Sequence, residues 1–77
     1  MKGLWNFSKA VFHARTAKGL TQEQTAEALG ISVRWYQCIE KGVGRPGFDL
    51  LLRIMILLEL DARDCVDDNV AMQLLHS

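Results

Sequence analysis

The fold is decided by residues 18–42, which read KGLTQEQTAEALGISVRWYQCIEKG. Thr21 and Gln24 have the spacing of a capping box, in which each side chain accepts a hydrogen bond from a free backbone N–H at the start of a helix. A helix is therefore predicted to begin at Gln22. It is predicted to end at Gly30, where the missing Cβ permits the positive φ that terminates helices.

A second helix is predicted over residues 33–41, with Ser32 as its cap. Because only two residues separate Gly30 from this helix, the two short helices meet across a very tight turn. At about 100° per residue, Tyr36 and Ile39 fall on one side of the helix and are predicted to be core. The other side carries the remaining candidates, which are Val33, Arg34, Gln37, Cys38 and Lys41.

These residue types suit the reading of bases. Arginine pairs with guanine through two hydrogen bonds, glutamine does the same with adenine, and a valine or cysteine side chain contacts the methyl group of thymine. For a helix taken alone, an ordinary solvated face explains the same residues.

Further helices flank this pair. Apolar spacing predicts a helix over residues 7–18 that ends at Gly19. Glycine and proline over residues 42–47 predict a loop, and a helix follows over residues 48–60. Asp61 is the predicted cap of a brief fifth helix through Arg63 and Val66. We therefore expect an all-α, compact five-helix domain over residues 7–67, between an N-terminal extension (1–6) and a C-terminal tail (68–77) that holds at most a short helix.

Charge is polarised along the chain, although the formal net charge is zero. Residues 1–47 carry seven basic and three acidic side chains, a balance of plus four. Residues 48–77 carry two basic and six acidic side chains, a balance of minus four. The asymmetry permits a phosphate-facing side and an acidic far side, and chance is the alternative explanation at this length.

Other classes of protein find little support. Cys38 and Cys65 lack the spacing of a zinc or redox motif, so no metal or cofactor is expected and a reduced, cytoplasmic location is the simpler interpretation. The densest apolar stretch, residues 50–58, is too short to cross a bilayer. His13 has no serine, cysteine or carboxylate at a catalytic spacing, and His76 is in the tail, so we do not expect an enzyme.

The order of these signals resembles the Cro and phage-repressor (XRE-type) helix-turn-helix family, with its lambda-repressor-like fold, across roughly residues 7–66. The matching elements are Arg15, Lys18-Gly19-Leu20-Thr21-Gln22-Glu23-Gln24, Ala26, Leu29-Gly30-Ile31-Ser32, Ile39-Glu40-Lys41-Gly42, Arg45-Pro46 and Leu51-Leu52-x-Ile54.

The resemblance implies binding to double-stranded DNA, with residues 33–41 as the recognition helix in the major groove and the preceding helix across the backbone. Arg15 and Glu40 would form a buried or half-buried ion pair that orients the recognition helix. Phosphate contacts would come from Gln22, from Ser32 as a secondary role after capping, and from Lys41 and Arg45, for which mere solvation is the alternative.

Two residues depart from the family pattern. Trp35 lies on the rim between core and groove, where it can stack on DNA, contact a partner chain or pack at the edge of the core, the last being favoured. Cys38 replaces a long polar side chain and would read little more than a methyl group. Both complete the expected DNA-contacting set.

The expected function is that of a small transcriptional regulator, acting as a repressor by occupying an operator. A homodimer is expected through the fourth helix, the fifth helix or the tail around Val70, Met72 and Leu75, because Leu50, Ile56 and Leu60 add apolar residues to the face that holds Asp49 and Arg53. The alternative for these leucines is that they fill the protein's own core. The alternative function is a protein-interaction module, such as an antitoxin or accessory subunit.

Overall fold

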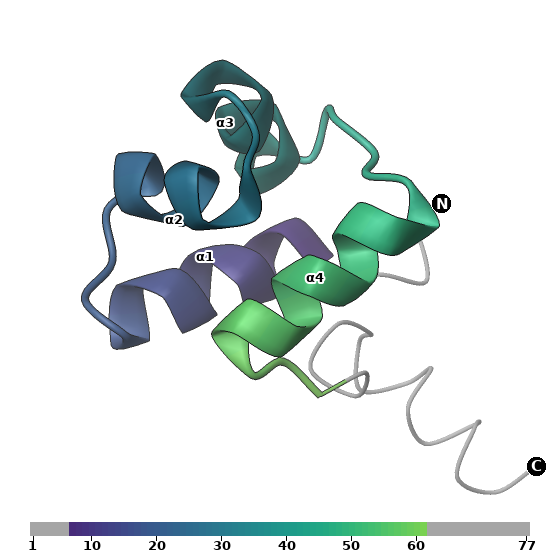
Figure 1. Ribbon diagram of the computed structural model, residues 1–77. Coiled ribbons are helices and arrows are strands. Elements are labelled where there is room, and N and C mark those ends of the chain that lie inside the picture. The colour runs from purple at the N-terminus through teal and green to yellow at the C-terminus, as the bar shows by residue number, and fades with distance from the viewer. Residues whose placement is uncertain (1–6, 62–77) are drawn as a thin grey trace, which may run out of the picture.

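The structure, a computed structural model, describes residues 7–61 and forms four helices there (Figure 1). They are α1 (Phe7–Ala17), α2 (Gln22–Leu29), α3 (Val33–Lys41) and α4 (Phe48–Leu58). No strand occurs in this range, so the all-α class is confirmed. The count of five helices is not supported, because the fifth was predicted to start at the last described residue. Its remainder lies outside the described residues, as do the N-terminal extension and the tail.

Local signals place α2 as predicted. The Thr21 hydroxyl accepts a hydrogen bond from the Gln24 backbone N–H at 3.0 Å, and the Gln24 side chain accepts one from the Thr21 N–H at 2.9 Å. At the other end Gly30 adopts a φ of 72°, and the Ile31 N–H donates to the Ala26 carbonyl at 3.0 Å. Both ends of α2 are thus set by residues within or next to it.

The ends of α3 are likewise set by residues next to the helix. The Ser32 hydroxyl accepts a hydrogen bond from the Trp35 N–H at 3.1 Å, which caps the first turn. The helix ends where Gly42 adopts a φ of 81°. Ser32 therefore uses its hydroxyl as a cap, as predicted.

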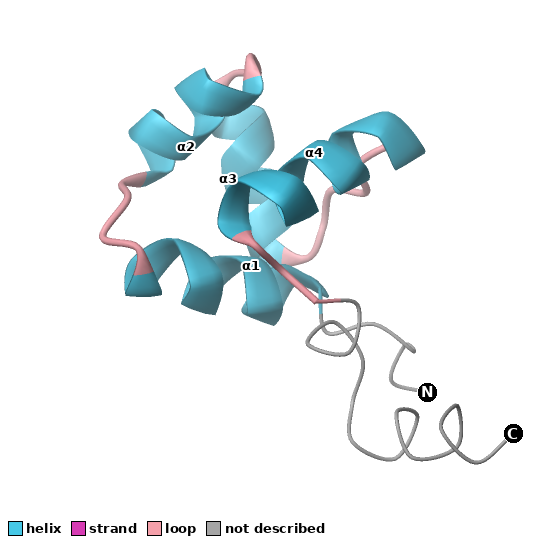
Figure 2. Cartoon of the chain, turned by 60° about the horizontal axis from the view of Figure 1, so that its bottom comes forward, coloured by secondary structure: helices cyan, strands magenta, loops and turns pink. Residues whose placement is uncertain are grey.

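The core lies where all four helices meet. In Figures 1 and 2, α1 runs along the base of the α2–α3 pair and α4 packs across α1. The buried side chains from the four helices include Val11, Leu29, Tyr36, Ile39, Ile54 and Leu58. Packing of this kind supplies most of the stability of short helices, which are marginal when isolated.

Two polar contacts attach α4 to the other helices. Arg53 donates a hydrogen bond through Nη2 to the carbonyl of Leu29, at the C-terminal end of α2 where a cation is favoured. At the far end of α4, Glu59 adopts a left-handed φ of 56° and forms an ion pair with Lys18, in which Lys18 Nζ lies 2.7 Å from Glu59 Oε2. The helix stops at Leu58, two residues before the predicted end.

The prediction for the apolar side chains of α4 was partly wrong. Leu50 and Leu60 are half-buried and pack against the core, which is the alternative considered for them. Ile56 is exposed as predicted, and Phe48 and Leu52 are exposed with it. Among residues 7–61, no helix is both long and apolar enough to span a membrane.

Candidate nucleic-acid interface

The two sides of α3 divide as its sequence predicts. Tyr36 and Ile39 are buried in the core. Arg34 and Lys41 are exposed on the other side. Gln37 lies between them in position and is half-buried. The two small side chains on this side are also half-buried, and they are Val33 and Cys38. The outward side of α3 is therefore a strip of polar and small apolar groups on a helix whose inner side is locked in the core.

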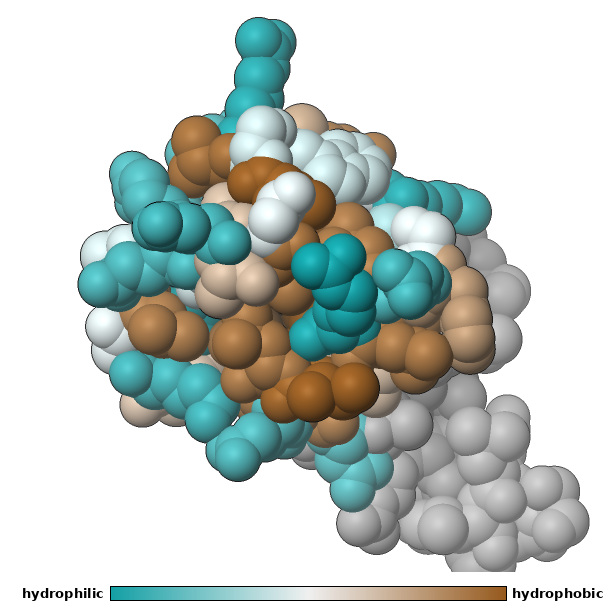
Figure 3. Space-filling model, in the orientation of Figure 1, coloured by the Kyte–Doolittle hydropathy of each residue, from teal (hydrophilic) through white to brown (hydrophobic). Residues whose placement is uncertain are grey.

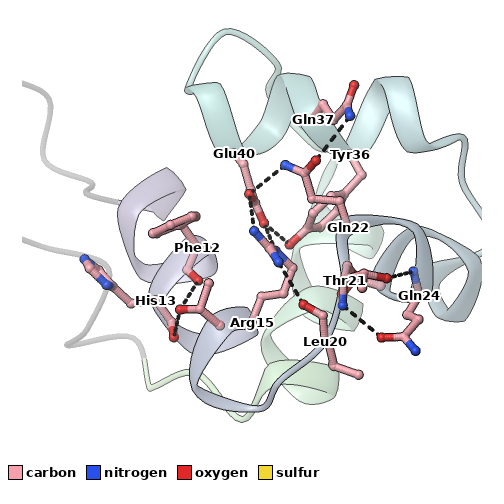
Figure 4. A network of polar contacts seen from close by, with 12 residues as sticks. Phe12, His13, Arg15, Leu20, Thr21, Gln22, Gln24, Tyr36, Gln37 and Glu40 are labelled. Carbon is pink, nitrogen blue, oxygen red and sulfur yellow. Dashed lines mark hydrogen bonds and ion pairs between the residues drawn. The ribbon is translucent and has the colours of Figure 1, made fainter.

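Glu40 lies at the centre of a polar network that joins three helices (Figure 4). Its Oε1 accepts hydrogen bonds from Arg15 Nη2 at 3.1 Å and from Gln22 Nε2 at 3.0 Å. Its Oε2 accepts from Arg15 Nε and from the Tyr36 hydroxyl. The predicted ion pair between Arg15 and Glu40 is confirmed, and it is bidentate. Arg15 also donates to the Leu20 carbonyl at 2.8 Å, which ties the α1–α2 loop to the network.

The charged side chains of the network are largely shielded from solvent. The side chains of Arg15 and Glu40 are 11% and 5% exposed. Burial alone would raise the pKa of Glu40, but the hydrogen bonds from Arg15, Tyr36 and Gln22 outweigh it and hold the pKa below its usual value. The hydrogen bond to Glu40 raises the pKa of Arg15. The pair is therefore ionised at neutral pH, and it fixes α3 against α1.

Tyr36 is held as a hydrogen-bond donor in the same network. Burial, followed by the hydrogen bond to Glu40 and its negative charge, raises the pKa of the Tyr36 hydroxyl far above its usual value. The hydroxyl therefore keeps its proton and donates a hydrogen bond to the Glu40 carboxylate. Its ring is fully buried, so one side chain serves both the core and the network.

The network reaches the outward side of α3 through Gln22. Gln37 Nε2 donates a hydrogen bond to Gln22 Oε1 at 3.2 Å, while Gln22 Nε2 donates to Glu40. The side chain of Gln22, a residue predicted to contact phosphate, thus lies beside Gln37, which is predicted to read a base, and it links Gln37 to the buried Glu40 carboxylate. The Gln22 backbone N–H belongs to the first turn of α2, where N–H groups have no acceptor within the helix.

Trp35 packs at the edge of the core, as favoured from the sequence. It is half-buried and contacts the core cluster. Its six-membered ring covers Gly44 so closely that a Cβ on Gly44 would lie 2.6 Å from Trp35 Cζ3 and 3.1 Å from Cη2. The same Cβ would lie 3.1 Å from the Cβ of Cys38. Gly44 therefore lets the loop after α3 pack closely against Trp35 and Cys38.

A comparison with known families agrees with this geometry. A family model of helix-turn-helix domains matches residues 13–64, about two thirds of the chain. The chain belongs to the Cro/C1-type helix-turn-helix family. Comparisons with curated proteins and with solved structures give no match. The matched range contains α2, α3 and α4 entirely and the C-terminal part of α1, so α2 and α3 are the helix-turn-helix of this family. Membership supports DNA binding in the regulation of transcription.

Three cations lie around this helix-turn-helix. Arg34 is in the first turn of α3, Lys41 in its last turn, and Arg45 in the loop that follows. All three are exposed, and none forms an ion pair with another residue of the range 7–61. Such cations are available to an external anion.

Sequence reasoning missed the two contacts that make the network continuous. The bond from Tyr36 to Glu40 joins residues four apart on one helix, a spacing that the sequence does show. The bond between Gln37 and Gln22 depends on the angle at which α2 and α3 meet, for which the sequence carries no direct signal.

Proposed function

We propose that the protein is a cytoplasmic transcriptional regulator that binds specific double-stranded DNA and represses by occupying its operator. The observation that supports this most is the outward side of α3, where Arg34, Gln37 and Lys41 stand on a helix held from behind by the buried Arg15–Glu40 pair. A rigid helix that presents such side chains fits the major groove. The family match to residues 13–64 supports the same role.

The proposed contacts fall into two groups. Arg34 and Gln37 read guanine and adenine, while Val33 and Cys38 contact thymine methyl groups. Phosphates are bound by the remaining polar and charged groups, which are the Gln22 backbone N–H, Ser32, Lys41 and Arg45. Trp35 lies at the rim and contacts the sugar-phosphate backbone through its exposed edge. No catalytic step is part of this role, so the protein acts by binding and not as an enzyme.

The operator would be bound by two copies. One small module makes few phosphate contacts, so a two-fold dimer on half-sites roughly 34 Å apart gives affinity that a single module lacks. The prediction that the chain forms a homodimer is part of this proposal.

The experiment that tests the proposal is selection of bound duplexes from a random pool, followed by binding measurements on the enriched sequence across a salt series. We expect a two-fold symmetric motif and an affinity that falls steeply as salt rises, because phosphate neutralisation releases counterions. Arg34→Ala should weaken the free energy of binding to the enriched site by about 1–3 kcal/mol and change binding to random duplex little, since it removes a base contact. No enrichment together with salt-independent binding would exclude the proposed function.

One observation favours a second candidate. Phe48 and Ile56 on α4 are each 76% exposed, which is unusual for large apolar side chains. The same fold could therefore serve as a protein-interaction module, such as an antitoxin or accessory subunit. Failure of duplex selection combined with a stable complex with another protein would favour this candidate.

A further inference from the structure

Two hydrogen bonds lead from the buried Glu40 carboxylate to the outward side of α3. Gln22 Nε2 donates to Glu40 Oε1 at 3.0 Å, and Gln37 Nε2 donates to Gln22 Oε1 at 3.2 Å. We name these three side chains the amide relay. In Figure 4 the relay passes from Glu40 at the centre of the network, through Gln22, to Gln37 at its edge. It connects a buried charge to a side chain that is proposed to contact DNA.

The direction of the relay is set by Glu40. An ionised carboxylate can only accept hydrogen bonds, whereas a glutamine amide has a donor at one end and an acceptor at the other. Burial opposes the ionisation of Glu40, but its hydrogen-bond donors outweigh burial and lower its pKa, so the carboxylate is charged at neutral pH. Gln22 must therefore turn its NH2 group toward Glu40, which leaves its Oε1 for the next amide.

Gln37 is constrained in the same way one step later. Because Gln22 offers it only an oxygen, Gln37 must supply a hydrogen from its NH2 group, and its own Oε1 faces away from Gln22 (Figure 4). Turning Gln22 around would set its oxygen against an oxygen of Glu40 with no hydrogen between them. A hydrogen bond to a charged group favours the observed direction by roughly ten- to a hundredfold.

We propose that Glu40 and Gln22 are positioning residues for base reading, which fix the Gln37 amide so that it presents its carbonyl oxygen and selects a base with an exocyclic amino group. In the major groove that group is N6 of adenine or N4 of cytosine. Guanine and thymine carry an oxygen instead, O6 or O4, which has no hydrogen to share with Gln37 Oε1. The inference rests on the proposed function, because it requires α3 to lie in the major groove.

A glutamine outside such a relay would not discriminate in this way. Its amide can rotate by half a turn and present either the NH2 group or the oxygen, so it can pair with any base. Arg34 and Lys41, one turn to either side of Gln37, carry only donors. Of these three side chains, Gln37 is therefore the one that supplies an acceptor, and the relay is what directs that acceptor outward.

The end of the relay lies where a duplex can reach it. In Figure 1, α3 lies at the upper edge of the molecule, and Figure 3, in the same orientation, shows a hydrophilic side chain that projects outward at that edge. Gln37 is half-buried, with the exposed Arg34 and Lys41 along the same side of the helix. A half-buried side chain can keep its contact with Gln22 and still present its outer atom to a base.

Base preference at one position of the enriched duplex tests the proposal. Gln37→Ala identifies that position, because only the preference for the contacted base should disappear. There the parent should bind adenine or cytosine at least about fivefold better than guanine or thymine. Gln22→Met keeps the length of the side chain and the backbone N–H but interrupts the relay, and it should reduce this ratio to about twofold or less. The preference at the position read by Arg34 should not change.

Glu40→Gln is an independent variant, two hydrogen bonds away from the DNA. An amide at position 40 can donate as well as accept, so the relay loses its direction and the same base position should become less selective. A purely structural role would instead weaken binding to all sequences alike. If circular dichroism shows that Glu40→Gln does not fold, Gln22→Met decides the question.

Glu23→Gln is the matched control. Glu23 is exposed beside Gln22 in the first turn of α2, and it lies outside the relay. Removing its charge should raise the affinity for every duplex alike, because the DNA backbone is negative. The base preference at the Gln37 position should stay within about twofold of the parent, since a charge near phosphates carries no sequence information.

Side-chain amide signals in nitrogen-15 NMR spectra test the relay without DNA. The Gln37 NH2 signals are identified by their loss in Gln37→Ala. They should exchange with water more slowly than those of Gln24, which is exposed on α2. This protection should be lost in Gln22→Met, because the acceptor is gone.

The outcomes separate the relay from the proposed function. Guanine or thymine at the Gln37 position overturns the proposal, as does a preference that survives Gln22→Met or an enriched motif in which Gln37→Ala changes no position. If selection enriches no motif, the proposed function fails, and the relay is then judged by the amide signals alone. Protection of the Gln37 amide that persists in Gln22→Met overturns the relay in either case.

Discussion

Replacing Glu40 by alanine removes the acceptor of four hydrogen bonds at once. Two come from Arg15 and one each from Tyr36 and Gln22. The Arg15 side chain, 11% exposed, is left as a buried charge without its counterion. Loss of one partner from such a pair costs about 3–5 kcal/mol. A domain of this length has roughly 4–12 kcal/mol of stability in total, so Glu40→Ala should remove a large fraction of the free energy of unfolding.

Glu40→Gln tests how much of this loss comes from the negative charge of the side chain. Glutamine keeps one carbonyl acceptor in the same place but removes the negative charge, so we expect a smaller loss of about 2 kcal/mol. Glu27→Ala is the control, because Glu27 is exposed on α2 and should change the free energy of unfolding by no more than about 0.5 kcal/mol. Urea unfolding followed by circular dichroism measures all three variants. If Glu40→Ala is as stable as Glu27→Ala, the network does not hold the fold together and our reasoning is refuted.

The pH dependence gives the same reasoning a second check. Since the pKa of Glu40 is lower in the folded protein than in the unfolded chain, its contribution to stability is fully present above the unfolded value of about 4.5. That contribution is lost as the pH falls through the folded pKa. The difference in unfolding free energy between the parent and Glu40→Gln should therefore shrink below about pH 4.5. A difference that stays constant from neutral to acidic pH would contradict this assignment.

Three further predictions concern the surface around α3. Gly44→Ala forces a Cβ into the Trp35 ring and should lower the free energy of unfolding by about 1–3 kcal/mol, whereas in a Trp35→Leu background this loss should largely disappear. A double-mutant cycle measured by urea unfolding tests the contact, and additive effects of the two substitutions would contradict it. Ser32→Ala should destabilise the protein by about 1 kcal/mol and Ser32→Gly by only a few tenths if capping is the main role, as thermal unfolding will show; equal losses would argue against it. Lys41→Ala should weaken DNA binding equally on all sequences and reduce the salt slope by about one, and a sequence-dependent loss would instead make Lys41 a base contact.

The parts of the fold that follow from the sequence are those set by neighbours in the chain. The capping box at Thr21 and the terminating Gly30 define α2 without help from any other element. Ser32 and Gly42 do the same for α3. These signals act over one turn of helix, so they survive in any tertiary context that permits the helix.

Features that depend on the angle between helices could not be predicted in the same way. The bond between Gln22 and Gln37 exists only because α2 and α3 cross closely. On α4 the periodic pattern alone does not say which of two apolar sides faces the core. The structure packs Leu50 against the core and leaves Phe48 at the surface, and Arg53 contacts the end of α2.

The arrangement of contacts separates the orientation of α3 from the identity of the side chains that it presents. Behind the helix, the Glu40 carboxylate joins it to α1 and α2, and Trp35 joins it to the following loop through Gly44. In front, Arg34 and Lys41 are exposed and take no part in those contacts. Because the front residues contribute little to folding, they can change without displacing the helix. Gln37 is the exception, since its amide donates a hydrogen bond to Gln22, so the fold itself constrains its place on the outward side of α3.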